Sequence, residues 1–464
     1  AMSTPDLVVI GAGPAGLAGA SLAAERGLSV LVLDEQSAPG GQIWRGIEAA
    51  NAAHRARLGK DYGLGRSAVT RFRRSGARYV PGTTVWQLDE TGEIGCTVGG
   101  RTHLFQTSAV LVATGAQERP FPVAGWELPG VMGAGAAQVL LKTGGLLAER
   151  AVLAGSGPLL YLLAVQYLAA GHPPAAILDT TPPGAWRMAR RHLPGALKHP
   201  LPLLKGLGWL NEIRRARVPW ERGVSSLVLE GSGHVDAVRW EAAGGRQGRI
   251  ETDHVFLHQG VVPSVNLTMA AGLDHDWDEG QLCWRPRTDD WGRSSAEPIH
   301  IAGDGGGIAG WEAAAATGEI ATLDILHLAG SLREAERNAL ADRHRRRVRG
   351  ALSVRPLLDA LYRPKPQFML PSEPATVICR CEEIARQDLE PLIGIGVLGP
   401  NQLKSFSRAG MGPCQGRLCG LTVQRLISEC TGRGMAETGY YRLRPPVKPV
   451  PLGAFADMDC GNAP

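Results

Sequence analysis

A glycine-rich turn between two short apolar strands constrains the fold of this chain more than any other feature. The strand Leu7–Ile10 (LVVI) leads into GAGPAG, a helical pattern continues to Gly27, and SVLVLD follows as the next strand. In such a β-α-β unit Gly11 allows the tight turn, Gly13 lets the backbone approach a pyrophosphate, and Gly16 lets helix and strand pack closely. The pattern predicts an α/β dinucleotide-binding domain whose helix N-terminus faces the phosphates.

An acid at the end of the second strand supports this interpretation. Asp34 lies 23 residues after Gly11, where a carboxylate can bond the ribose hydroxyls of an adenosine. A GxGxxG pattern alone is a weak signal, but inside a strand-turn-helix-strand unit with a terminal acid it is a strong one. We therefore predict a dinucleotide at this turn.

A second unit of the same kind begins at Ala151 but departs from the glycine pattern. AVLAGSGPLLYLLAVQYLAAG and AAILDT repeat the strand-turn-helix-strand order, with Gly155 and Gly157 at the first two glycine positions. The third position holds Leu160, which would push the helix off the strand or fill phosphate-side volume. We expect this unit to fold, with Asp179 ending its second strand, and to have lost NAD(P)H binding. An adenine nucleotide held without redox chemistry is the intermediate alternative.

Length and composition narrow the class of protein. The 464 residues suffice for two or three domains. The net charge of +5 is mild, so the block RHRRRVR (343–349) is interpreted as a solvated helix face and no nucleic-acid partner is expected. No run of about 18 apolar residues occurs, which predicts no membrane span. The first strand begins too early to leave room for a signal peptide, so we expect a cytoplasmic protein.

Eight unevenly spaced cysteines indicate metal or redox use rather than a disulfide framework. Four of them form a C-x-C pair and a C-x4-C pair, with 32 residues between the pairs: Cys379, Cys381, Cys414 and Cys419. Four thiolates can hold zinc or an iron-sulfur cluster. Zinc sites favour C-x2-C spacing, whereas this spacing spans a wider object. A [2Fe-2S] cluster is therefore preferred and zinc is the alternative.

The surroundings of these four cysteines agree with a cluster. Three glycines would let backbone N–H groups approach bridging sulfides: Gly412, Gly416 and Gly420. Four basic residues would offset the negative charge of a cluster: Arg380, Lys404, Arg408 and Arg417. Residues 121–282 contain no cysteine, so a redox-active cysteine pair in the second unit is excluded and thiol-disulfide chemistry at the dinucleotide is not expected.

The segment 184–223 mixes arginine and lysine with three tryptophans and several Leu-Pro pairs. One interpretation is an irregular helical insertion that packs on its own domain. The other is a docking surface for a partner, because tryptophan and arginine anchor interfaces. The sequence leaves the two open.

Two segments distant along the chain resemble further parts of the dinucleotide site that begins at Gly11. SAVLVATGAQERP (108–120) contains a strand ending in Ala-Thr-Gly, and IHIAGDGGGIAGWEAAAATGEIA (299–321) a strand ending in Gly-Asp before a small-residue helix. With the first turn they resemble the two-dinucleotide-domain flavoprotein oxidoreductases, which implies FAD at this site and Asp304 on its ribityl-pyrophosphate region. The residues so implied in FAD binding are Gly11, Gly13, Pro14, Ala15, Gly16, Asp34, Glu35, Gly41, Gln42, Ala113, Thr114, Gly115, Gly303 and Asp304.

The C-terminal segment, with GMGPCQGRLC, resembles the small [2Fe-2S] domains of the bacterioferritin-associated ferredoxin type. The whole order of motifs over residues 5–440, with TGAQERPFPVAGWELPGVMGAGAAQVLLK (114–142), resembles the large subunits of multi-subunit amine and imino-acid dehydrogenases. That family includes the large subunits of opine (octopine/nopaline) oxidase, of hydrogen cyanide synthase and of D-hydroxyproline or L-proline dehydrogenase, with the sarcosine oxidase alpha chain as a more distant relative.

This resemblance implies a division of labour between subunits. A beta subunit with its own FAD oxidises the C–N bond of a small-molecule amine, FMN lies at the subunit interface, and a small gamma subunit completes the complex. The chain itself relays electrons through FAD and the cluster, with peripheral delivery to the respiratory chain, and no catalytic residue is assigned to it. The alternatives are a self-contained NAD(P)H-dependent ferredoxin-type reductase and a non-catalytic assembly subunit.

The expected fold is therefore α/β, a two-dinucleotide-binding-domain flavoprotein with two Rossmann-like domains and a small C-terminal helical [2Fe-2S] domain. The expected boundaries follow from the motifs and from the Pro-rich segment before the cysteines. They are 1–120 and 270–365 for a discontinuous FAD-binding domain, 121–269 for the second Rossmann-like domain, 366–375 for a linker, 376–440 for the [2Fe-2S] domain and 441–464 for a tail.

Overall fold

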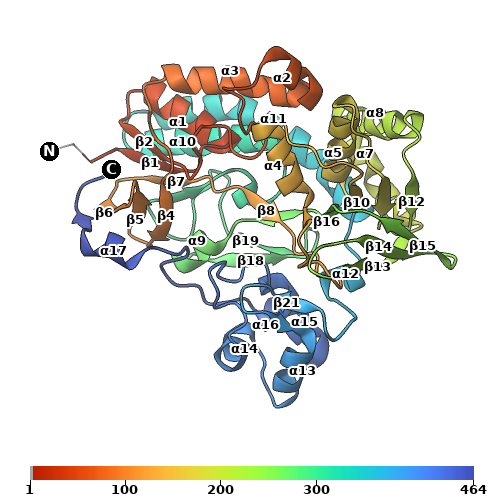
Figure 1. The fold of residues 1–464 in the computed structure, drawn as a ribbon. Coiled ribbons are helices and arrows are strands. Elements are labelled where there is room, and N and C mark those ends of the chain that lie inside the picture. The colour runs from red at the N-terminus through yellow and green to blue at the C-terminus, as the bar shows by residue number, and fades with distance from the viewer. Residues whose placement is uncertain (1–3) are drawn as a thin grey trace. The chain divides into compact units, whose positions relative to one another are not determined.

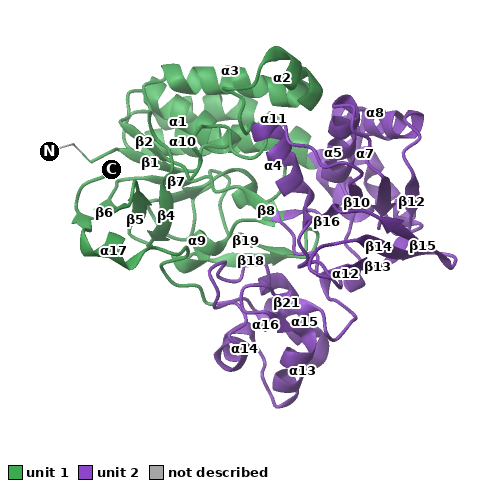
Figure 2. Ribbon diagram, in the orientation of Figure 1, with its two compact units in different colours: residues 1–117, 262–352, 442–464 green, residues 118–261, 353–441 purple. Residues whose placement is uncertain are grey.

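A computed structural model describes residues 4–464 of the chain. It contains two compact units, coloured separately in Figure 2. Unit 1 comprises residues 1–117, 262–352 and 442–464, and unit 2 comprises residues 118–261 and 353–441. The predicted [2Fe-2S] domain, residues 376–440, lies within unit 2.

Unit 1 is built on a five-stranded parallel sheet (Figure 1). Its strands in spatial order are β20 (Ile299–Ile301), β7 (Val110–Val112), β1 (Leu7–Ile10), β2 (Val30–Leu33) and β3 (Arg78–Val80). All of them except β3 are fully buried, as the continuous apolar runs of a covered parallel sheet require. The β-α-β unit predicted from GAGPAG is present as β1, α1 and β2.

The remaining elements of unit 1 are helices and the strands of two smaller sheets, antiparallel except where β23 pairs with β6. The helices are α1 (Pro14–Glu25), α2 (Ala52–Leu58), α3 (Lys60–Arg74), α9 (Asn266–Ala270), η2 (Gly303–Gly305), α10 (Trp311–Leu328) and α17 (Leu452–Ala456). The strands are β4 (Thr84–Leu88), β5 (Glu93–Val98), β6 (Arg101–Gln106), β18 (His275–Asp278), β19 (Cys283–Pro286) and β23 (Asp459–Cys460). The tail predicted at 441–464 joins this unit, because β23 pairs with β6.

Helices α1 and α10 lie side by side (Figure 1) and fix the position of the glycine-rich turn. A Cβ atom on Gly318 of α10 would lie 2.1 Å from the carbonyl oxygen of Ala15. A side chain at this position would therefore separate the two helices, and glycine is required for their close approach.

Unit 2 contains a second five-stranded parallel sheet. Its strands in spatial order are β12 (Trp220–Arg222), β11 (Ala176–Asp179), β10 (Val152–Gly155), β16 (Val255–His258) and β9 (Val131–Gly133). The helices are α4 (Ala134–Gly144), α5 (Pro158–Ala169), α6 (Ala185–Ala189), η1 (Arg190–His192), α7 (Leu193–Ala196) and α8 (Leu201–Arg215). An antiparallel sheet follows, of β13 (Val224–Glu230), β14 (Ala237–Ala242) and β15 (Arg246–Glu251). The prediction of a fold with two Rossmann-like domains is confirmed.

The part of unit 2 that carries the clustered cysteines is mainly helical. Its elements are α12 (Pro366–Met369), β21 (Val377–Cys379), β22 (Ile384–Ala385), α13 (Arg386–Gly394), α14 (Pro400–Ser407), α15 (Gly420–Thr431) and α16 (Met435–Thr438). The chain passes from one unit to the other at four points: three lie within strand β8 (Ala116–Glu118), strand β17 (Val261–Pro263) and helix α11 (Glu334–Leu361), and the fourth lies between Tyr441 and Arg442.

A buried ion-pair network supports the sheet of unit 1. The carboxylate of Asp324 on α10 is fully buried and accepts hydrogen bonds from Arg293 at 2.6 and 2.8 Å and from Arg337 at 2.7 Å. Its Oδ2 also lies 2.9 Å from Nε2 of His300, on β20. Burial raises the pKa of Asp324, but hydrogen bonds from His300 and Arg293 outweigh it and hold the pKa well below its ordinary value.

We predict that Asp324→Asn destabilises the protein by about 3 kcal/mol, because it leaves the buried guanidinium of Arg337 and the partly exposed guanidinium of Arg293 without their carboxylate. The stability that the ionised group contributes is fully present above the ordinary aspartate pKa of about 4 and falls as the pH drops below it towards the depressed folded value. Urea unfolding of both proteins should therefore show a difference that narrows in acid. The same change at exposed Asp290 is the control, and equal effects at the two positions would contradict the account.

Candidate functional site

The first glycine-rich turn has the geometry of a tight nucleotide-binding turn. Gly11 has φ +102°, and a Cβ atom on it would lie 2.5 Å from the carbonyl oxygen of Ala113. A Cβ atom on Gly16 would lie 1.9 Å from the carbonyl oxygen of Gly11. At Gly13 the nearest atom to such a Cβ is the Gly41 Cα, at 3.8 Å. The turn is closed where helix meets strand and open at the glycine that would face a pyrophosphate, which fits the dinucleotide.

The predicted ribose carboxylate is tied to this turn. Asp34 is half-buried at the end of β2, and its oxygens accept hydrogen bonds from the backbone N–H of Ala12 at 2.5 Å and of Gln36 at 2.7 Å. Burial raises the pKa of Asp34, although these bonds and the nearby guanidinium of Arg45 oppose the shift. The neighbouring Glu35 is exposed and forms an ion pair with Lys448 of the C-terminal tail.

The Ala-Thr-Gly and Gly-Asp segments meet beside the same sheet edge. A Cβ atom on Gly305 would lie 3.4 Å from both Gly115 N and the Thr114 hydroxyl oxygen. Asp304 accepts hydrogen bonds from the backbone N–H of Ala309 and Gly310, each at 3.0 Å. Its carboxylate thus shapes the loop that enters α10, whose N-terminus favours negative charge.

Unit 1 therefore brings together all the residues predicted to bind FAD. Pro14 and Ala15 open α1, and the backbone N–H of Gly40 donates to the carbonyl oxygen of Ala12 at 2.8 Å, which folds the Gly41–Gln42 segment back onto the turn. Ala113 and Gly303 follow β7 and β20 at the same side of the sheet. Sequence reasoning missed Arg45 and Lys448, because neither belongs to a local motif.

The second glycine-rich turn faces a histidine. A Cβ atom on Gly155 would lie 1.8 Å from the backbone oxygen of His258, and one on Gly157 would lie 3.7 Å from the His258 Nε2. The imidazole is buried, and its Nδ1 lies 2.8 Å from an oxygen of Glu118. The space beside Gly13, the second glycine of the first turn, is open, whereas the imidazole of His258 lies beside Gly157, the second glycine of this turn.

The ribose end of the second unit is filled by side chains. Asp179 is buried at the end of β11, where its Oδ2 accepts hydrogen bonds from the Tyr161 hydroxyl at 2.8 Å and the Trp220 indole N–H at 3.3 Å. Burial, and then Asp179, raise the pKa of Tyr161 well above its ordinary value, so the phenol stays a donor. Leu160 is fully buried on α5. It stands at the third glycine position, where a binding turn has no side chain.

The four clustered cysteines form two thiol pairs. Cys379 and Cys419 are buried and share a hydrogen bond, while Cys381 and Cys414 are partly exposed and share another. A Cβ atom on Gly412 would lie 2.3 Å from the Cys381 Cβ, so this glycine allows the loop to reach the thiols.

The thiol of Cys379 has a lowered pKa. The hydrogen bond from Cys419, opposed by burial and supported by backbone N–H groups, lowers the pKa of Cys379 to about 6. The same bond and burial raise the pKa of Cys419 well above its ordinary value. Because the thiolate is the form that binds a metal, Cys379 is a suitable first ligand.

Two of the glycines expected beside a cluster have another role. Cβ atoms on Gly416 and Gly420 would lie 2.6 Å from the ring of Tyr441 and 2.1 Å from the hydroxyl of Tyr440. These glycines make room for two tyrosines, and the Tyr441 hydroxyl lies 3.9 Å from the Cys419 sulfur. The sequence analysis missed both tyrosines, which lie beyond the cysteine motif.

The basic residues near the thiols already have partners. Arg408 forms an ion pair with Glu382 and Arg417 donates to the Cys414 carbonyl oxygen at 3.0 Å. Lys404 lies 5.6 Å from the Tyr441 ring centre and Arg380 lies 5.2 Å from that of Trp126. Within residues 4–464, no group of three or more His, Cys, Asp or Glu side chains is arranged to hold a metal ion. The [2Fe-2S] cluster stays a prediction.

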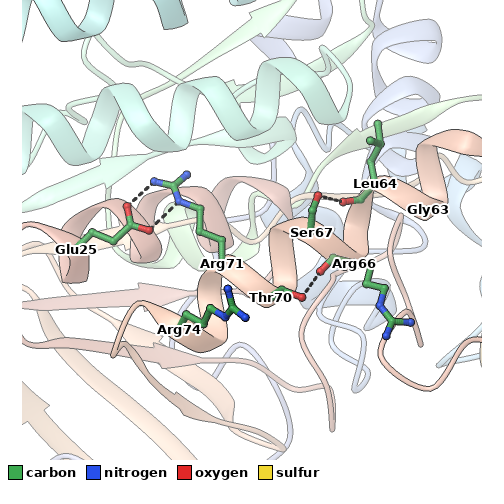
Figure 3. Close-up of a pocket in the computed structure, with 8 residues that line it drawn as sticks. All are labelled: Glu25, Gly63, Leu64, Arg66, Ser67, Thr70, Arg71 and Arg74. Carbon is green, nitrogen blue, oxygen red and sulfur yellow. Dashed lines mark hydrogen bonds and ion pairs between the residues drawn. The ribbon is translucent and has the colours of Figure 1, made fainter.

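A shallow pocket of about 750 Å³ lies elsewhere in unit 1, on the surface of α3 (Figure 3). Its lining residues are Glu25, Gly63, Leu64, Arg66, Ser67, Thr70, Arg71 and Arg74. Arg71 is held by Glu25 at 2.8 Å and by Glu319 at 3.0 Å, so its charge is used in structural ion pairs. None of the predicted site residues lines this pocket.

Two family models match separate parts of this chain. Residues 5–191 match the pyridine nucleotide-disulphide oxidoreductase family, and residues 376–458 match the sarcosine oxidase A3 domain. The crystal structure of L-proline dehydrogenase from P. horikoshii has a TM-score of 0.72 at 18% identity, covering 97% of this chain and 79% of that one. The fold is thus that of a dinucleotide-binding oxidoreductase, and it implies FAD as a cofactor.

Two relatives are similar over nearly their full lengths. The A subunit of opine oxidase from Agrobacterium tumefaciens (strain Ach5) is 45% identical, with 98% of this chain and 92% of the relative covered. The HcnB subunit of hydrogen cyanide synthase from Pseudomonas aeruginosa is 33% identical, with 97% and 98% covered.

The chain therefore belongs to the family of opine oxidase A subunits. At the level of the family, the predicted class, an oxidoreductase acting on CH–NH donors, is confirmed. Relatives named as subunits imply that the chain has partner subunits. Among residues 4–464, no helix combines the length and apolar character needed to cross a bilayer.

We predict that Asp304→Ala lowers FAD occupancy, because removing a charged hydrogen-bonding group costs about 1.5–3 kcal/mol. Flavin released by denaturation, measured per chain, gives the occupancy. Asp304→Asn removes the negative charge but keeps an oxygen that can accept from the Ala309 and Gly310 N–H groups. It therefore distinguishes the effect of the charge on FAD occupancy from the effect of the loop conformation. Full FAD retention in Asp304→Ala would mean that the Gly-Asp segment is misassigned.

Proposed function

We propose that this chain is the electron-transferring FAD and [2Fe-2S] subunit of a heteromeric dehydrogenase or oxidase. The complex oxidises the C–N bond of an opine, amino acid or imino acid, such as octopine, nopaline or hydroxyproline. Substrate oxidation takes place on a beta subunit with its own FAD, FMN lies at the subunit interface, and a small gamma subunit completes the complex. Family membership and the names of the relatives support the substrate class.

The observation that carries the proposal is the occupied second dinucleotide turn. Asp179 is buried under Tyr161 and Trp220, the imidazole of His258 lies beside Gly157, and the third glycine position holds a buried leucine. A nicotinamide dinucleotide would need the ribose carboxylate and the phosphate-side backbone at once. We infer that electrons reach this chain from another subunit.

The thiol pairs supply the other half of the proposal. Cys379, Cys381, Cys414 and Cys419 lie close enough to interact with one another, and the C-x-C and C-x4-C spacing favours a two-iron cluster over zinc. When bound, FAD exchanges electrons in twos and a [2Fe-2S] cluster exchanges them singly, so together they convert one kind of transfer into the other. The chain's own residues hold both groups and keep water from the buried thiol pair.

A self-contained NAD(P)H-dependent reductase is the alternative. It is favoured by the β10–α5–β11 unit, in which Gly155 and Gly157 both keep positive φ angles, at +139° and +111°. It requires Tyr161 and Trp220 to release Asp179, so that a nucleotide could replace them.

We predict that the purified chain contains FAD and about two irons with acid-labile sulfide. Cys381→Ser should remove most of the iron and leave FAD in place, because the thiols lie in unit 2 and the predicted FAD residues in unit 1. Cys430→Ser, at an exposed cysteine on α15, is the matched control and should retain the iron. Stoichiometric zinc without sulfide would rule out the cluster and leave the FAD assignment untouched.

We also predict that neither NADH nor NADPH reduces the flavin of the isolated chain. Anaerobic stopped-flow mixing, with the flavin absorbance followed in time, checks this directly. Dithionite reduction of the same sample shows that its flavin is competent. Rapid bleaching by either nucleotide would support the reductase and contradict the relay.

A further inference from the structure

The insertion between β11 and β12 presents apolar side chains that neither site uses. It consists of α6, η1, α7 and α8, and we call its outer face the α6–α8 surface. Six large apolar residues on it are between 51% and 69% exposed: Trp186, Met188, Leu197, Leu201, Leu204 and Leu207. Scattered single leucines on a surface are ordinary, but six exposed large apolar side chains on one short segment, 186–207, indicate an interaction site.

The inner face of the insertion is packed, which fixes the direction of the outer one. Ala189 and Ala196 are buried against Val354 and Leu357 of α11, within unit 2. On α8, Ile213 is fully buried. At 100° per residue, Leu201, Leu204 and Leu207 lie on the side of the helix away from Ile213. The exposed leucines are therefore held outward by a core on the opposite side.

The charge of the same segment has one sign. No aspartate or glutamate occurs from residue 180 to residue 211. Five basic side chains in that range are exposed: Arg187, Arg190, Arg191, Lys198 and Lys205. Two of them have local contacts, since Arg191 donates to His192 and Lys205 lies 5.2 Å from the Trp209 ring centre. The segment thus combines outward leucines with a net positive charge.

We propose that the α6–α8 surface docks the protein onto an anionic phospholipid bilayer. Outward leucines and tryptophan beside lysine and arginine are the composition of helices that lie in a membrane interface, where the apolar side chains enter the acyl boundary and the cations meet lipid phosphates. The absence of acidic residues from 180 to 211 matches the negative charge of such a bilayer. This inference does not depend on the proposed relay function.

The test is sedimentation of the full-length chain with vesicles of phosphatidylcholine alone and of phosphatidylcholine mixed with phosphatidylglycerol. We expect binding only to the anionic vesicles, weakened by salt. Leu204→Asp should reduce partitioning by about tenfold, the effect of removing one partly inserted leucine. Lys198→Glu should also reduce it, and Lys198→Arg should restore it.

Ile395→Asp is the matched control, because Ile395 is 75% exposed on a different part of unit 2. It should bind vesicles like the unchanged chain, and an unchanged circular dichroism spectrum and thermal unfolding transition show that each variant is folded. Equal binding to neutral and anionic vesicles, or equal loss in Ile395→Asp and Leu204→Asp, would overturn the proposal. A failure to bind either kind of vesicle would also overturn it, whether or not Leu204→Asp prevents assembly with a purified partner subunit.

Discussion

The closeness of helix and strand at the first glycine-rich turn is the constraint on which the dinucleotide site depends. Gly16 brings α1 within reach of β1, where any Cβ atom would meet the Gly11 carbonyl oxygen at 1.9 Å, and Gly318 brings α10 against α1. These approaches set where Asp304 and the entry to α10 lie relative to the turn. The geometry of the predicted FAD site therefore depends on backbone packing at these glycines, and the predicted polar residues lie on the turn and loop that this packing brings together.

The same β-α-β unit occurs twice, and the surroundings of its glycine-rich turn differ between the two copies. In unit 1 the acid at the end of the second strand is Asp34, which accepts hydrogen bonds from two backbone N–H groups. The space beside the second glycine, Gly13, is open. In unit 2 the acid is Asp179, which two aromatic side chains cover, and an imidazole lies beside the second glycine. Retaining a Rossmann-like unit while occupying its site keeps the core that its strands and helix provide.

Local pattern predicted most of the fold and little of what surrounds each site. The alternation of apolar strands and glycine turns predicted both β-α-β units, since period and turn chemistry are local properties. The contacts of Tyr161 and Trp220 with Asp179, of Glu118 with His258, and of Tyr441 with the thiols join residues distant along the chain, and no local pattern records them. The return of the tail as β23 was missed for the same reason.

If electrons enter this chain from a partner subunit, electron paramagnetic resonance of the purified complex should detect them after a substrate is added. The complex would be mixed anaerobically with octopine, nopaline and hydroxyproline in turn and frozen at successive times. If the chain relays electrons, at least one of these compounds should produce the signal of a reduced [2Fe-2S] cluster in the complex. None of them should do so in the isolated chain. Appearance of that signal in the isolated chain on addition of NADH or NADPH would contradict this relay.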